Sequence, residues 1–163
     1  MSGEAEIQAQ LLRKFPFLEG KVRVARERRL FADAPADKVG EVFAHATGPL
    51  GFTILCTITG LDLGENLGAI YHLARPTGEV LNLSTAVPKT RPVLATVSGQ
   101  FPAADAYERE LMDLLGFRVQ GLPPGSRYPL PDGWPAGQYP LRKDWKAESL
   151  DGVFPPAKEA DRA

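Results

Sequence analysis

Three neighbouring segments of alternating apolar and polar residues constrain the fold of this sequence more than any other feature. They cover residues 53–59, 69–75 and 80–87, and a glycine-rich turn and a Pro-Thr-Gly turn separate them. A period of two is typical of strands with one buried face. The connections between these segments are short, whereas two parallel strands would need a connection of a dozen or more residues. The sequence therefore predicts a three-stranded antiparallel meander.

Helical patterns lie on both sides of this meander. Apolar residues at helical spacing predict helices around residues 7–14, 35–47 and 103–115, each followed by a proline or glycine that stops it. Residues 21–25 alternate as a half-buried strand does. This order of elements predicts an α+β fold, in which helices pack on one face of an antiparallel sheet.

Proline is distributed unevenly along the chain. Eight of the fifteen prolines fall within residues 117–163, together with both tryptophans. A flexible linker would be rich in glycine and serine and poor in aromatic residues. We therefore expect an α+β core domain over residues 1–116 and an extended, proline-rich docking tail over residues 117–163. The tail could lie in a groove of a partner or on the chain's own domain, and its composition does not separate the two.

The charge balance argues against a nucleic-acid partner. Lysine and arginine total 19 against 20 for aspartate and glutamate, which gives a net charge of −1. One basic run, residues 21–29, holds five cations and one acid but no aromatic residue that could stack on a base. We interpret it as a charged edge strand that resists aggregation or contacts an acidic partner, and we expect no nucleic-acid binding.

Few residues of this chain can ligate a metal or act as nucleophiles. There is one cysteine, Cys56, and two histidines, His45 and His72. Four-cysteine zinc sites and self-contained iron–sulfur clusters are therefore excluded, and no glycine-rich nucleotide loop is present. Cys56 shares a predicted strand face with Ile54 and Ile58, so we expect a buried core thiol, and His72 is expected to be a half-buried polar residue. We predict no metal site and no cofactor.

No export signal or membrane span is expected from the sequence. The first residues carry acids where a signal peptide would have basic residues and an apolar stretch. The longest stretch without a formal charge, residues 42–61, contains Pro49, three glycines and four threonines. A spanning helix needs about 20 mainly apolar residues, so we interpret this stretch as a helix end, a turn and a strand.

The predicted last helix carries most of the clustered carboxylates. Its apolar stripe contains Tyr107, Leu111, Leu114 and Leu115. On the opposite face Asp105, Arg109 and Asp113 follow at i, i+4 spacing, so that each acid could pair with the arginine.

Glu108 differs from these residues because it lies at the edge of the apolar stripe. A carboxylate there must find a cation or backbone donors, or else be protonated. The cluster allows two interpretations. One is a free-standing enzyme that uses these carboxylates as general acid and base, and the other, which we favour, is a solvated or interface helix.

Several ordered motifs resemble those of the thirty-kilodalton subunit of NADH:quinone oxidoreductase (respiratory complex I). Tyr107–Gly116 resembles that family's YERExxDLFGI signature, and residues 132–135 with Tyr139–Asp144 resemble its DDWP…PLRKD tail. Residues 69–73 and 101–102 also fit the family. Where the family typically has GHPDLRR, residues 121–127 read GLPPGSR. The tail is similar to the version in energy-converting [NiFe] hydrogenases and formate hydrogenlyases.

The resemblance implies a non-catalytic structural subunit, without a cofactor, in the peripheral arm of a membrane-bound redox complex. Its expected partners are the [NiFe]-hydrogenase-like large subunit and the iron–sulfur small subunit. The expected location is the cytoplasmic side of the cell membrane, contacting the membrane only through partner subunits. The motif helix and the tail would supply the interface residues. These are Glu108, Arg109, Glu110, Asp113, Trp134, Tyr139, Leu141, Arg142, Lys143, Asp144 and Trp145.

Overall fold

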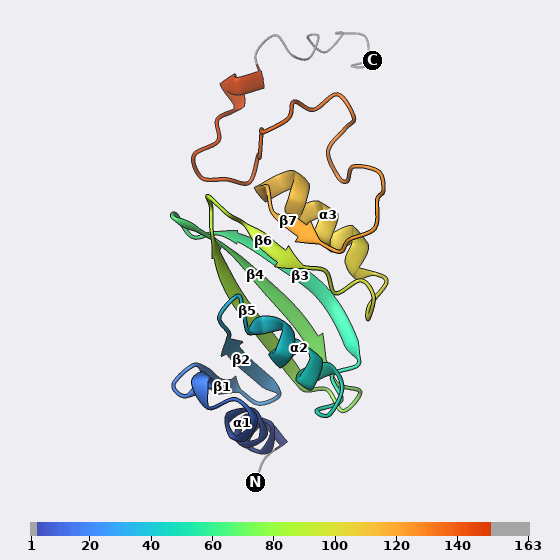
Figure 1. Ribbon diagram of the computed structural model, residues 1–163. Helices are drawn as coiled ribbons and strands as arrows, with labels where there is room; N and C mark the ends of the chain where they lie inside the picture. Colours follow the sequence, from blue (N-terminus) through green and yellow to red (C-terminus); the bar gives the residue numbers. More distant parts are fainter. Residues whose placement is uncertain (1–2, 151–163) are drawn as a thin grey trace, which may run out of the picture.

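A computed structural model describes residues 3–150 of the chain (Figure 1). Residues 151–163 of the predicted docking tail lie outside the described residues. The helices are α1 (Gly3–Lys14), α2 (Val39–Thr47) and α3 (Ala104–Leu115), with short 3-10 helices at Pro16–Leu18 and Ala147–Leu150. The strands are β1 (Val22–Arg26), β2 (Arg29–Asp33), β3 (Ile54–Asp62), β4 (Asn66–Ala74), β5 (Val80–Pro88), β6 (Val93–Ala95) and β7 (Arg118–Gln120).

The predicted meander is confirmed. Strands β3, β4 and β5 pair antiparallel in chain order, and they form three of the five strands of a sheet with the order β1-β2-β5-β4-β3. The sheet is mostly antiparallel, as predicted, with one exception: β2 runs parallel to β5. Parallel pairing needs a long connection, which α2 and the first two strands of the meander supply here. β1 is an edge strand, as its charged sequence predicted.

Helices cover one face of this sheet, as predicted for an α+β fold (Figure 1). Paired residues of neighbouring strands share a face, so Tyr71 and its partner Leu83 point to the same side. Phe43 of α2 contacts Tyr71 edge to face, with 5.3 Å between the ring centroids. Side chains from all three α-helices, including Leu11 and Leu111, join these strand residues in one core cluster. None of the helices within residues 3–150 is long and apolar enough to cross a bilayer.

The prediction of a buried thiol at Cys56 is wrong. The register between β3 and β4 shifts between Leu55 and Thr57, which places Cys56 in a bulge. An extra residue in one strand moves the following side chains to the other face. Leu55 and Ile58 therefore point into the core, whereas Cys56 is exposed and Ile54 is 47% exposed. Strict alternation along the segment could not reveal this irregularity.

Two short strands have no counterpart in the sequence prediction. β6 and β7 form a separate parallel pair, in which the Arg118 amide donates to the Pro92 carbonyl at 2.7 Å and the Thr96 amide donates to the Gln120 carbonyl at 2.8 Å. Each strand has only three residues, too few to show a period. β6 precedes α3 and β7 follows it, so their pairing brings together the two segments that flank the helix.

Gly60 of β3 sets the distance between α3 and the sheet. A Cβ atom built on Gly60 would come within 2.5 Å of the Leu111 side chain and would also overlap Leu115. Both leucines are buried, so they cannot move aside without disturbing the core. The absence of a side chain at this position is therefore what allows α3 to lie directly on β3.

We predict that Gly60→Ala destabilises the fold by about 1–3 kcal/mol, because the new methyl group overpacks the contact with α3. The free energy of unfolding in urea measures this change. Gly99→Ala is the matched control, since a Cβ built on Gly99 meets no atom within 4 Å. Equal stability of the two variants would contradict the proposed close contact.

Candidate functional site

The residues predicted to form an interface lie on α3 and on the segment after it, residues 121–146. This segment has no helix or strand, and it runs past the C-terminal end of α3 (Figure 1). We call α3 together with residues 117–146 the α3–tail unit. Side chains of α3 hold the segment at successive points, which are described below from the start of the helix to its end.

Arg109 makes the first of these contacts. Its guanidinium group binds the Asp105 carboxylate through two bonds, Nε to Oδ1 at 2.6 Å and Nη2 to Oδ2 at 2.9 Å. The same Nη2 atom donates to the Pro123 carbonyl at 2.8 Å. The predicted pairing of Arg109 with Asp105 is confirmed, but its pairing with Asp113 is wrong, because Asp113 binds a different arginine.

Asp113 holds the next part of the segment. It accepts a bond from Arg127 Nε at 2.9 Å and one from the Leu130 amide at 3.2 Å. Arg127 Nη1 in turn donates to the Trp134 carbonyl at 2.7 Å. The Asp113 carboxylate therefore holds the tail at two points, Arg127 and Leu130. Arg127, which belongs to the tail, also binds the Trp134 carbonyl and so links a third point to the helix.

The tail also satisfies the C-terminal end of α3. Gly116 ends the helix in the left-handed conformation, with φ 78°, as the sequence predicted. The Leu114 carbonyl accepts the Leu141 amide at 3.0 Å, and the Leu115 carbonyl accepts Arg142 Nε at 2.7 Å. The last carbonyls of a helix have no partner within the helix, and a cation is favoured there. Arg142 supplies both a donor and that charge.

The side chains of the tail pack against one another around this cap. The Arg142 guanidinium lies over the Tyr139 ring, 4.4 Å from its centroid. The rings of Trp134 and Trp145 are 6.1 Å apart, and both indole nitrogens donate to Gln138, one to its backbone carbonyl and one to its side-chain oxygen. The aromatic residues predicted as anchors are therefore half-buried within the tail itself.

Asp62, at the end of β3, binds the tail to the sheet. Its Oδ2 atom accepts Lys89 Nζ at 2.8 Å and the Lys143 amide at 2.8 Å, and its Oδ1 atom accepts the Gly64 amide at 2.8 Å. The Asp62 side chain is only 2% exposed. These bonds, led by the one from Lys89, hold the pKa of this carboxyl well below its usual range. Sequence reasoning missed Asp62, because its main partners are distant in the chain.

Glu108 is buried on the side of α3 that faces β6. It is 2% exposed, and its two oxygens accept the Val97 amide at 2.7 Å and the Thr96 hydroxyl at 2.5 Å. A carboxylate at this position needs a cation or backbone donors, and the Val97 amide is such a donor. Burial nevertheless outweighs these bonds and raises the pKa of Glu108.

The predicted interface residues thus differ in what they offer to a partner. Arg109, Asp113 and Arg142 bind other parts of the chain, while Leu141, Lys143 and Asp144 are exposed. Leu141 is 57% exposed, a large apolar side chain between charged neighbours. Tyr128, which sequence reasoning did not select, is 51% exposed on the same unit. Glu110 is half-buried.

This geometry is suited to recognition more than to acid–base chemistry. The carboxylates of Glu108 and Asp113 both accept bonds from the chain's own donors. Within residues 3–150, no group of three or more His, Cys, Asp or Glu side chains could hold a metal ion. An exposed leucine beside a lysine and an aspartate, on a segment fixed by buried bonds, has the composition of a protein contact.

The chain is similar in sequence to known proteins. Residues 32–150 match the family described as the 30 kDa subunit of the respiratory-chain NADH dehydrogenase. One relative is a subunit of the F420H2 dehydrogenase of Methanosarcina mazei, which is 32% identical over 136 residues, 82% of this chain and 85% of that protein. The membrane-bound hydrogenase subunit beta of Pyrococcus furiosus is 39% identical over 89 residues, 52% of this chain and 51% of that protein.

Two solved structures are similar to this fold. One is a chain of the membrane-bound sulfane sulfur reductase, an archaeal respiratory membrane complex, with a TM-score of 0.77 and 28% identity over 97% of this chain and 96% of that chain. The other is a trypsin-resistant fragment of Nqo5, with a TM-score of 0.60 and 27% identity over 71% of this chain and 98% of that chain. The first of these matches extends over the α3–tail unit.

We predict that Asp62→Asn destabilises the chain by about 1–3 kcal/mol at neutral pH, because a charged acceptor of several bonds is lost. Since the pKa of Asp62 is lower in the folded chain than in the unfolded one, its stabilisation is present above about pH 4 and is lost as the pH falls further. Urea unfolding between pH 3 and pH 7 measures the difference, with the exposed Asp132→Asn as control. A difference that stays constant over this range would contradict the assignment.

Glu108 should give a pH dependence of the opposite sign. Its pKa is raised by burial, so its ionisation disfavours the folded state, and stability falls as the pH rises above about 4. Glu108→Gln removes this ionisation. Urea titrations give the free energy of unfolding of both chains at each pH. The value for the native chain minus the value for the variant should decrease between pH 4 and pH 7. If the free energies of unfolding of the two chains changed equally with pH, the pKa of Glu108 would not be raised in the folded chain.

Proposed function

Because the chain belongs to the family of the 30 kDa subunit of the respiratory-chain NADH dehydrogenase, we propose that it is a non-catalytic structural subunit of a membrane-bound redox complex. The chain is a subunit of the complex I-like or hydrogenase-like class, since its relatives are subunits of such membrane complexes. In this proposal the partners carry the cofactors, and this chain contributes contact surface.

The proposed position is the peripheral arm, on the cytoplasmic side of the membrane. The chain would pack there against a [NiFe]-hydrogenase-like large subunit and an iron–sulfur small subunit. The observation that carries the proposal is the exposed group formed by Leu141, Lys143 and Asp144 on a segment that is otherwise bound to its own domain. An apolar side chain with charges at its rim is the usual arrangement of a contact centre in a protein interface.

The bonds within the α3–tail unit support this role by reducing the entropy cost of binding. The tail amides of Leu141 and Lys143 are bound to the Leu114 carbonyl and the Asp62 carboxylate. A segment that is already ordered loses little conformational freedom when a partner binds. Arg109, Asp113 and Arg142 would then act by positioning the tail, while Leu141 and Lys143 would contact the partner directly.

We predict that Leu141→Asp reduces co-purification of the large subunit with the tagged native chain at least tenfold. The substitution places a charge where the proposal has an apolar side chain entering the partner, and burying an unpaired charge is costly. Its effect on the chain alone should be small, because the Leu141 side chain is 57% exposed and the variant keeps the backbone amide that bonds to Leu114. Quantitative immunoblotting of the purified complex measures the outcome.

Val24→Asp is the matched control for this experiment. Val24 is 41% exposed, but it lies on β1, the edge strand at the far end of the sheet order from β3. The control should leave co-purification unchanged. If Leu141→Asp also left assembly intact, the docking role of the tail would be excluded. A point variant is sharper than deletion of residues 130–163, because the deletion also removes the cap of α3.

A further inference from the structure

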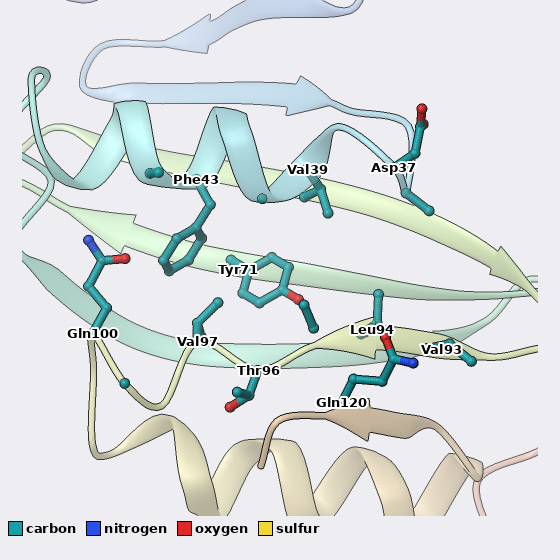
Figure 2. A pocket seen from close by; sticks show the side chains of 15 residues that line it. Asp37, Val39, Phe43, Tyr71, Val93, Leu94, Thr96, Val97, Gln100 and Gln120 are labelled. Atoms are coloured by element: carbon teal, nitrogen blue, oxygen red, sulfur yellow. The ribbon is translucent and has the colours of Figure 1, made fainter.

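A groove with a mainly apolar lining runs between α2 and β6, on the side of β6 opposite α3 (Figure 2). Its volume is about 480 Å³. Phe43, Tyr71 and Leu94 are buried side chains that line it, and residues of α2 and β6 form its two walls. A mainly apolar lining favours an occupant with apolar side chains over a strongly polar small molecule.

One wall of the groove is an unpaired strand edge. Within the described residues β6 pairs only with β7, and the Pro92 carbonyl and the Thr96 amide point toward that partner. Backbone groups of a strand alternate in direction, so the carbonyls of Val93 and Ala95 and the amide of Ala95 point the other way. Figure 2 shows α2 and β7 on opposite sides of β6, so these three groups face the groove.

The opposite wall lets another backbone come close. Gly40 and Ala44, one helical turn apart on α2, both line the groove and are exposed. A Cβ built on Gly40 meets no atom within 4 Å, so the space in front of the helix is open. Small side chains at these two positions leave room for a chain beside the edge of β6.

The floor of the groove contains the hydroxyl group of a largely buried tyrosine. Tyr71 is only 3% exposed, and no hydrogen bond of its hydroxyl is found within residues 3–150. Figure 2 shows its ring in the groove, between α2 and β6. The Tyr71 hydroxyl is not among the fully buried polar atoms without a partner, so it is open to the groove, where a backbone group of a bound segment would form a hydrogen bond with it.

We propose that an extended segment of a neighbouring subunit binds in this groove as an added strand on the free edge of β6. Its backbone would bond to Val93 and Ala95, and every second side chain would contact the apolar floor, so that residues with small or apolar side chains are favoured. The inference rests on the proposed function, because it takes the neighbour from the same complex. It concerns a surface separate from Leu141, and so it can fail independently.

The first test fills the groove. Gly40→Leu places a side chain in the open space, and leucine is a better helix former than glycine, so the isolated chain should be no less stable. We expect at least a tenfold loss of the native partner subunits in co-purification. Glu41→Leu is the control, because Glu41 is exposed on the next position of α2 and does not line the groove. Undiminished co-purification of Gly40→Leu would overturn the proposal.

The second test follows single amides by hydrogen exchange, in the isolated chain and in the purified complex. The Ala95 amide should exchange at least tenfold more slowly in the complex, whereas the Thr96 amide, already bonded to Gln120, should be slow in both. Equal exchange of Ala95 in the two states would overturn the inference and leave the role of Leu141 standing. Protection of Ala95 in the isolated chain would also overturn it, because the occupant would then be a second copy or the chain itself. Recovery of no partner subunit at all would contradict the proposed function as well.

Discussion

The contact of α3 with Gly60 determines where the other parts of the molecule can lie. The helix reaches the sheet only because β3 has no side chain at this point. From this position Glu108 can accept the Val97 amide, and the chain can leave the helix to pair β7 with β6. The end of α3 then stands where the tail can supply its missing donors. The arrangement of the whole tail therefore depends on one small residue, Gly60, on the edge strand β3.

The features that the sequence predicted correctly are those that depend on near neighbours. The meander, the three helices and the left-handed residue Gly116 follow from period, breakers and turn residues within a few positions. The bulge at Cys56 could not be predicted, because it depends on how β4 pairs with β3. The parallel pairing of β2 with β5 likewise depends on which strand of the meander lies beside β2, and these strands are far apart in the sequence.

The same distinction applies to the candidate site. Glu108 could be identified as a carboxylate in need of donors, but Thr96 and Val97 as those donors could not, since they precede the helix by a loop. Asp62 is the last residue of β3, and nothing near it in the sequence marks it as the acceptor for the Lys143 amide. The two interpretations of the proline-rich tail are compatible. Its described residues contact their own domain, and those contacts leave Leu141 free for the proposed partner.

The three bonds that join residues 141–143 to the rest of the chain also have a mechanical consequence. Residues 141–143 are joined to the C-terminal carbonyls of α3 on one side and, through Asp62, to the end of β3 on the other. A force applied to the tail is therefore shared between a helix and a strand that are themselves packed together at Gly60. A pull on the tail would therefore load α3 and β3 at the same time, and several bonds would have to break together before the segment is released.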